Sequence, residues 1–260
     1  MRIPSAVRLL ALIAAGLCLR CPPSLQAQAD GGATVNDGGG TGVLESIYIP
    51  NLPNAPFSLA LRTEWVHTLP NGGTFTQVNA RPIMRDSAGR VYQERWLLVP
   101  KGSGIASVMT TIQVDDPVAH VFYQCRVYQK VCELYPSVAG LAHYDPTRLK
   151  SGPLNNGKGT FLHEDLGDQR FAGLPVHGYR DTTTLNAGAL GNDMPMVTVR
   201  EFRYSAQLGF NLYSVLDAAQ VGREIFTVEA LSTNEPDPKF FQPPEGYKLV
   251  DRRKPASPTP

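Results

Sequence analysis

The residues of this chain best suited to chemistry are two cysteines in its middle and five scattered histidines. Cys125 and Cys132 flank a predicted turn at Tyr128-Gln129, and hairpin pairing would place the two cysteines directly opposite each other. Opposed Cβ atoms in a β-ladder lie about 4.5–5.5 Å apart, which is close to disulfide reach. The spacing therefore predicts a structural disulfide. A redox-active or metal-binding pair is the alternative, but this pair forms no C-x-x-C motif and has no second cluster of metal ligands.

The histidines show no spacing typical of a catalytic or metal site. They are His67, His120, His143, His163 and His177. The run from His163 to Asp165 contains three consecutive metal-ligand types, but neighbours on a strand point to opposite faces and cannot all reach one ion. Gly102-Ser103-Gly104 is not a nucleophile elbow, and no Walker or G-x-G-x-x-G motif is present. We therefore predict no catalytic, metal-binding or cofactor-binding residue, and a protein that is not an enzyme.

Alternating apolar and polar residues predict strands along most of the chain. Residues 57–65 show this period most clearly, and Asn71-Gly72-Gly73 and Asp86-Ser87-Ala88-Gly89 are typical turns. Pro82 predicts an edge strand or a bulge. One helical turn is expected at Phe240-Phe241. The remaining predicted strands cover 74–85, 90–99, 107–114, 118–127, 131–135, 163–171, 174–185, 196–205, 210–217, 224–233 and 247–250.

Short connections between these strands favour a mainly β fold with a curled antiparallel sheet. Roughly ten strands are expected, and a twisted sheet of that size tends to curl or close. Residues 136–160 lack periodicity, which predicts a long loop with one short helix near 138–144. Because a loop of this length is unusual in a compact domain, it is a candidate for function.

Aromatic residues recur at alternating strand positions, which permits two interpretations. They could fill an ordinary sheet core. They could instead line an apolar hollow in the curled sheet, since half-barrel interiors commonly hold one small apolar ligand. The candidates for such a lining are Trp65, Trp96, Phe122, Tyr204 and Tyr213.

The first 29 residues have the features of a secretory signal peptide. Arg2 and Arg8 precede an apolar run that is too short to span a bilayer, and Ala27-Gln28-Ala29 fits a cleavage site. We therefore expect an exported protein, periplasmic or extracellular, with a flexible leader at 30–42, a β-rich domain at 43–253 and a disordered tail at 254–260. Cleavage removes three arginines and leaves 21 basic against 23 acidic residues. This near-neutral balance argues against a nucleic-acid partner and against electrostatic docking to an anionic membrane.

Several segments resemble a family of uncharacterised exported bacterial proteins that is abundant in acidobacteria. They are Asp86–Arg90 with Glu94-Arg95, Asp116-Pro117, Leu174–Thr184, Gly191–Pro195, Glu201–Ser205 and Glu235–Tyr247. The resemblance covers most of residues 55–250. The closing segment is also similar to the end of LolA/LolB-like lipoprotein-carrier domains, and this implies a curled sheet in an open half-barrel. Neither family offers catalytic residues to carry over, and a shared fold does not fix function.

The sequence thus favours an exported, non-enzymatic protein that binds an apolar or lipidic ligand in the hollow of a half-barrel. A first alternative is an envelope module that binds another protein and no ligand. A second is a hydrolase that uses the 136–163 loop with His143 and His163. Nucleic acid is not expected as a partner, and the mature chain has no expected transmembrane segment.

Overall fold

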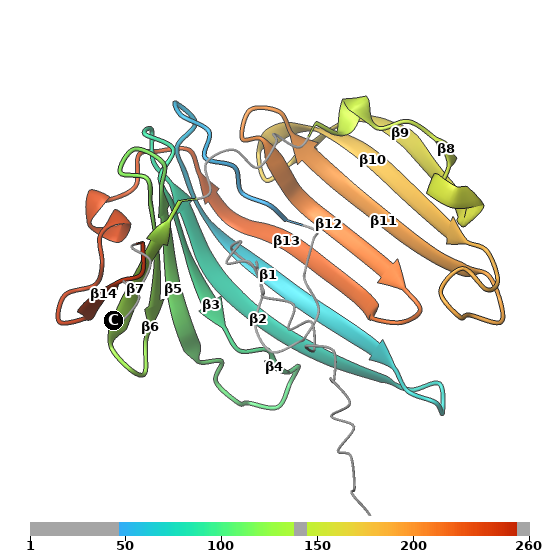
Figure 1. Cartoon of the computed structure of the whole chain (residues 1–260), viewed down its shortest axis with the longest axis horizontal. Helices are drawn as coiled ribbons and strands as arrows, with labels where there is room; N and C mark the ends of the chain where they lie inside the picture. The colour runs from blue at the N-terminus through green and yellow to red at the C-terminus, as the bar shows by residue number, and fades with distance from the viewer. Residues whose placement is uncertain (1–46, 138–144, 254–260) are drawn as a thin grey trace, which may run out of the picture. The chain divides into compact units, whose positions relative to one another are not determined.

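Alternating burial along the first strand shows how this sequence builds its sheet. In β1, Phe57–Thr68, the side chains of Phe57, Leu59, Leu61 and Thr63 are buried, while their neighbours are half-exposed. Successive side chains on a strand point to opposite faces, so a period of two buries one face. The computed structural model describes residues 47–137 and 145–253, and these form one long sheet (Figure 1).

The sheet has 14 strands, so the predicted count of roughly ten was too low. After β1 the strands are β2 (Thr74–Arg85), β3 (Val91–Trp96), β4 (Val99–Pro100), β5 (Met109–Asp116), β6 (Val121–Arg126), β7 (Val131–Pro136), β8 (Gly152–Pro153), β9 (Gly159–Phe171), β10 (Leu174–Leu185), β11 (Met196–Ser205), β12 (Phe210–Ala218), β13 (Gly222–Ser232) and β14 (Lys248–Asp251). Three short 3-10 helices complete the elements: η1 (Pro146–Arg148), η2 (Asn155–Gly157) and η3 (Pro238–Phe241). The predicted helical turn at Phe240-Phe241 is confirmed by η3.

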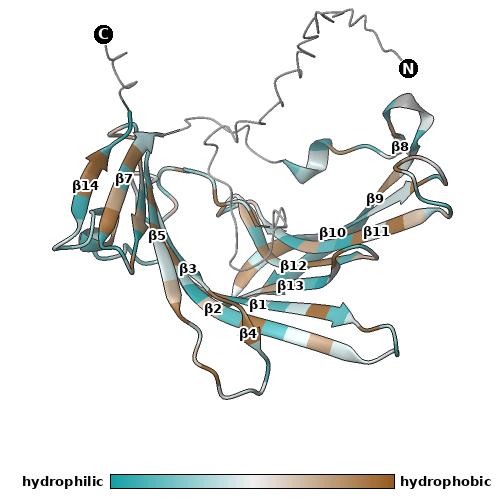
Figure 2. Cartoon of the chain, turned by 60° about the horizontal axis from the view of Figure 1, so that its bottom comes forward, coloured by the Kyte–Doolittle hydropathy of each residue, from teal (hydrophilic) through white to brown (hydrophobic). Residues whose placement is uncertain are grey.

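Strand order confirms the predicted fold class, a mainly β protein with an open, curled antiparallel sheet. The order is β14-β7-β6-β5-β3-β2-β1-β13-β12-β11-β10-β9-β8, and β4 pairs with β2 beside this path. The ladder does not close, because β14 and β8 are its two edges. Pairing of β1 with β13 joins the N-terminal and C-terminal strands (Figure 2). The parallel pairing of β14 with β7 is the exception to antiparallel order.

The two faces of the sheet are covered differently. We call the face that carries Leu59, Leu61 and Ile83 the inner face, and the opposite face, which carries Arg62 and Glu64, the outer face. On the inner face a buried apolar cluster extends over β1, β2 and β13. On the outer face η3 covers β3 and β5–β7, where Phe241 joins Val114 and the two cysteines in a second cluster.

Hairpin geometry confirms the predicted disulfide. Cys125 and Cys132 are directly opposed in the β6–β7 ladder, they are bonded, and both are fully buried. The turn at Ala172-Gly173 between β9 and β10 has positive φ angles of 48° and 84°. Two consecutive residues with positive φ are typical of the two-residue turns that match strand twist.

Pro82 differs from expectation, because β2 is a central strand. Pro82 falls between residues 83–85, which pair with β3, and residues 77–78, which pair with β4. This gap in pairing accommodates a residue that has no N–H to donate. The predicted signal peptide, leader, tail and 138–144 helix all lie outside the described residues. No helix within 47–137 and 145–253 is long and apolar enough to cross a membrane.

Candidate ligand-binding face

An apolar zone occupies the centre of the inner face. Cross-strand register places Phe226 and Val228 of β13 beside Thr63 and Leu61 of β1. The apolar members of this zone are each at most 4% exposed. They are Phe57, Leu59, Leu61, Ile83, Phe226 and Val228. Tight burial of this kind gives the sheet its main hydrophobic stabilisation.

Two buried polar atoms lie within one cross-strand row of this zone. Asn79 pairs with Thr63, Thr63 with Phe226, and Phe226 with Ser214, so all four side chains share the inner face. The Asn79 amide donates from Nδ2 to the Trp96 carbonyl at 2.8 Å, but its Oδ1 atom has no partner in the described part of the chain. Ser214 is fully buried, and its Oγ atom also has no hydrogen-bond partner in the described part of the chain. Buried polar atoms without partners are uncommon and call for a specific reason.

An aromatic zone with two histidines covers the inner face of β9, β10 and β11. The Tyr179 ring lies 5.0 Å from the ring of His163, 4.8 Å from that of His177 and 5.5 Å from that of Phe202. Tyr204 belongs to the same buried cluster as Tyr179 and Phe202. Burial raises the pKa of the Tyr179 and Tyr204 hydroxyls, so both stay protonated at neutral pH.

Each histidine of this zone contacts a carboxylate. His163 Nδ1 lies 2.5 Å from Asp181 Oδ1. His177 lies between two aspartates, with Nε2 2.6 Å from Asp165 and Nδ1 2.7 Å from Asp168. Partial burial would lower the pKa of His177, but the hydrogen bonds and charges of the two aspartates outweigh it, and the net shift is upward.

A polar zone extends over the inner face of the strands from β2 to β7. The Arg95 side chain donates from Nε to Gln113 Oε1 at 2.8 Å, and both residues are buried. Glu133 accepts from Tyr135, forms an ion pair with Arg126 at 2.6 Å, and forms another with Arg252 at 3.0 Å. Burial opposes the charge of Glu133, yet these partners lower its pKa overall. The inner face therefore changes from aromatic at β9–β11, through apolar, to basic and polar at β3–β7.

The five aromatic residues predicted as a lining do not share one face. Trp65, Phe122 and Tyr204 lie on the inner face by register, and Trp65 donates its indole N–H to the Val221 carbonyl at 2.6 Å. Trp96 and Tyr213 lie on the outer face. The Trp96 indole donates to Glu94 Oε2 at 2.7 Å.

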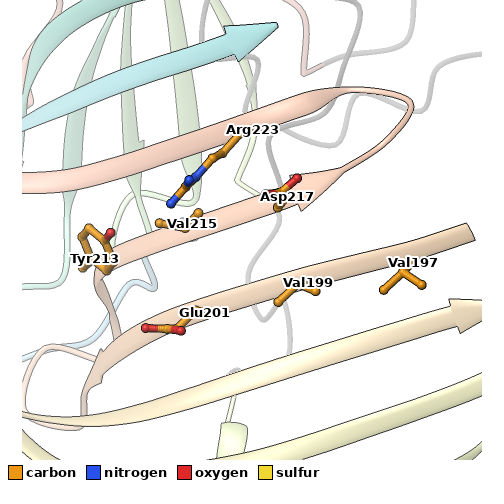
Figure 3. A pocket seen from close by; sticks show the side chains of 7 residues that line it. All are labelled: Val197, Val199, Glu201, Tyr213, Val215, Asp217 and Arg223. Carbon is orange, nitrogen blue, oxygen red and sulfur yellow. The ribbon is translucent and has the colours of Figure 1, made fainter. Parts of the chain in front are cut away.

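A shallow hollow on the outer face surrounds Tyr213. Its volume is about 370 Å³, and Figure 3 shows side chains from β11, β12 and β13 around it. The lining residues are Val197, Val199, Glu201, Tyr213, Val215, Asp217 and Arg223. Three charged side chains, three valines and one tyrosine therefore surround this hollow.

His163, which was predicted for a hydrolase site, lies on β9 beside Asp181 and Ser151. Asp181 could orient the His163 ring as a base, yet Ser151 Oγ bonds the main chain of His163, with 2.8 Å to its nitrogen. His143 lies outside the described residues. Within the described residues, 47–137 and 145–253, no group of three His, Cys, Asp or Glu side chains could hold a metal ion. By register His163 and Asp165 point inward, while Glu164 points outward, as alternation predicts.

Comparisons with known proteins gave distant structural similarity and no family. No family model and no curated protein matches the chain. An uncharacterised conserved protein from Thermus thermophilus is similar with a TM-score of 0.38 and 10% identity, over 78% of this chain and 93% of that one. MucB is similar with a TM-score of 0.39 and 16% identity, over 75% and 60%. A putative outer membrane lipoprotein-sorting protein domain from Vibrio parahaemolyticus is similar with a TM-score of 0.20 and 12% identity, over 71% of this chain and 88% of that one. Function therefore has to be inferred from the residues of this chain, and the acidobacterial resemblance stays a prediction.

Sequence reasoning missed the inward-facing arginines and the paired histidines. A signal for the arginines was present, because Arg81 and Arg85 share the parity of Ile83 on a predicted strand. The histidine zone had a weaker signal in the alternation of His177, Tyr179 and Asp181. The contacts of His177 and Asp181 with residues of β9 depend on the register of the β9–β10 hairpin, and this register includes a bulge beside Gly178.

Proposed function

We propose that this protein is an exported binding protein that holds an apolar or lipidic ligand against the inner face of its curled sheet. The row from Asn79 through Thr63 and Phe226 to Ser214 carries the proposal. It combines a closely packed apolar surface with Asn79 Oδ1 and Ser214 Oγ, which lack partners in the described part of the chain. Sites for small ligands typically combine a mostly apolar lining with a few placed polar groups.

The order of the three zones suits an amphiphile. An apolar body would contact the half-exposed margin of the central zone at Trp65, because the middle of that zone is already buried, and an acidic or polar group would face the half-exposed Arg126. We assign the inward-facing members of the predicted lining, Trp65, Phe122 and Tyr204, to this ligand. Non-covalent contacts of this kind need no catalytic group, so the proposed role is binding rather than chemistry.

The two tryptophans of the chain provide a matched test, because Trp65 faces inward and Trp96 faces outward. Trp96→Phe leaves Trp65 as the fluorophore, and Trp65→Phe leaves Trp96. A brominated fatty acid should quench the fluorescence of Trp65 several-fold more strongly than that of Trp96, because bromine quenches at short range. Equal quenching of both residues, or of neither, contradicts an inner-face site.

Native mass spectrometry of protein purified from its own compartment tests the same proposal without a probe. A bound mass that is extractable as lipid is expected. A clean apo mass, together with no displacement of a fluorescent fatty acid, would remove its basis.

An envelope module that binds a protein is the second candidate, and the outer-face hollow around Val199 and Tyr213 favours it. Val197 at its margin is 47% exposed. Pull-down from the native envelope separates the two candidates. A partner that is lost in Val199→Asp, with no lipid in either sample, would favour the module.

A further inference from the structure

Exposed apolar side chains are concentrated at one end of the sheet. We call this end the rim. It comprises the β1–β2 tip at 69–73, the segment 97–108 around β4, the β6–β7 turn at 127–130, the β10–β11 loop at 186–195 and the β12–β13 turn at 219–221, and Figure 1 shows the first two at the lower edge of the sheet. Register places these segments at one end, because Thr68 pairs with Thr74 and Leu185 pairs with Met196.

Ten of the twelve large apolar residues that are exposed in the described part of the chain lie at or beside this rim. Val118, in the turn before β6, and Leu162, within β9, are the other two. The ten range from 41% to 99% exposed, and they are Leu69, Phe75, Leu97, Ile105, Val108, Tyr128, Leu190, Met194, Val197 and Leu249. Single exposed apolar residues are ordinary on a protein surface, but a concentration at one end marks an interaction site.

Charges at the rim complement an anionic surface. The exposed cations there are Lys101, Lys130, Lys158, Arg223 and Lys248, against the exposed carboxylates of Asp193, Asp217 and Glu245. In the turns at the opposite end, acids outnumber bases among the exposed charges, with Asp168, Glu235 and Asp237 against Arg170 and Lys239. The near-neutral charge of the whole chain therefore hides an uneven distribution between the two ends.

We propose that the rim docks on an anionic lipid bilayer, with its apolar loop tips in the headgroup region and its lysines against the lipid phosphates. Apolar residues flanked by lysine and arginine are the chemistry of interfacial membrane binding. The apolar residues come from separate loops and from the ends of β2, β11 and β14, and this scattered arrangement suits a fluid surface better than a shaped protein partner. The docking does not depend on whether the inner face holds a ligand.

Vesicle flotation of the exported protein tests this proposal, with an identical N-terminus in every variant. The wild-type protein should float with vesicles of phosphatidylcholine mixed with phosphatidylglycerol, and less with phosphatidylcholine alone. Ile105→Ser with Val108→Ser, and separately Leu190→Ser with Met194→Ser, should weaken binding by about tenfold each. High ionic strength should weaken wild-type binding by a further factor of about three.

The matched control is Val118→Ser, compared with the single rim variant Met194→Ser, because both residues are 69% exposed and Val118 lies at the opposite end of the sheet. This control should bind as the wild-type protein does. Failure of the wild-type protein to float with anionic vesicles overturns the proposal, as does equal weakening by the control. Loss of a captured envelope protein in the rim variants, with vesicle binding unchanged, would assign the rim to a protein partner and also overturn it.

Discussion

Arg85 donates from Nη2 to the carbonyl oxygen of Leu208 at 2.8 Å, although β1 and β13 lie between their strands in the sheet. Arg85 ends β2, and Leu208 lies in the turn before β12. In a flat sheet, strands three steps apart are separated by roughly 14 Å. The contact therefore depends on the curl of the sheet and on the turn that bends over its inner face.

Removal of the Arg85 guanidinium should strongly destabilise the protein. This side chain is fully buried and also donates to the carbonyls of Ala55 at 2.9 Å and Pro50 at 2.8 Å, and burial lowers its pKa to about 10. Arg85→Met removes a charged donor from three carbonyls, of which that of Pro50 keeps only the Leu52 N–H, and should lower the free energy of unfolding by about 3 kcal/mol or more. Urea denaturation measures the change.

Arg62→Met is the matched control for that prediction. Arg62 forms an ion pair with Glu64 at the half-exposed outer face, so its loss should cost less than about 1 kcal/mol. Similar losses from the two variants would show that Arg85 does not connect the curled sheet.

Loss of the disulfide should weaken the protein without altering its fold. The bond between Cys125 and Cys132 closes a short loop within one hairpin, and the chain-entropy model gives about 2–3 kcal/mol for a loop of this size. Cys125→Ala with Cys132→Ala should lower the unfolding free energy by that amount. A reductant should destabilise the wild-type protein similarly and leave the variant unchanged. Two free thiols in the exported wild-type protein would contradict the bond.

Local patterns in the sequence were sufficient to predict the hairpins, but they did not predict the order of the strands in the sheet. Cys125 faces Cys132 because the turn between them is short, and the same logic holds at Ala172-Gly173. Pairing of β1 with β13 joins residues far apart in the chain, and no turn signal encodes it. The parallel β14 was predicted as a strand, but its partner β7 could not be identified from its four residues.

Alternation indicates that two faces exist, but not which residues share the functional one. Trp65 and Trp96 are both on predicted strands, yet the register across β1, β2 and β3 places them on opposite faces. A bulge shifts the alternation of side chains between the two faces by one residue. Assigning two residues to the same face therefore requires the register of every pair of strands that lies between them. The predicted lining therefore mixed inward and outward residues.

Gly222 should tolerate no side chain, because two constraints coincide there. Its φ angle is +86°, and a Cβ atom would lie 2.5 Å from the Val66 carbonyl oxygen. Gly222→Ala should therefore cost about 3 kcal/mol or more in unfolding free energy. Gly102→Ala is the control, since Gly102 has a φ of +78° with open space around it and should cost only about 1–2 kcal/mol. Equal costs for the two variants would show that β1 does not approach this turn closely.

His177 should stabilise the β9–β10 hairpin in its protonated form. Partial burial opposes protonation, but Asp165 and Asp168 on its two ring nitrogens raise the pKa of His177 above its usual value. A raised pKa in the folded state gives stability that is fully present below the unfolded pKa of about 6.5 and is lost as pH rises through the folded value. The hydrogen bond from the Gly167 backbone and that from His177 lower the pKa of Asp165, so this carboxylate stays charged across that window.

His177→Gln should therefore lower the melting temperature more at about pH 5 than at about pH 9. Titration of the His177 ring protons by NMR should give a pKa above about 6.5, and Asp165→Asn with Asp168→Asn should return it toward that value. The double aspartate variant keeps the hairpin and its polar side chains but removes both charges, which separates electrostatics from packing. A wild-type pKa at or below the usual value, or a stability difference that grows with rising pH, would show that burial and not the two aspartates controls this histidine.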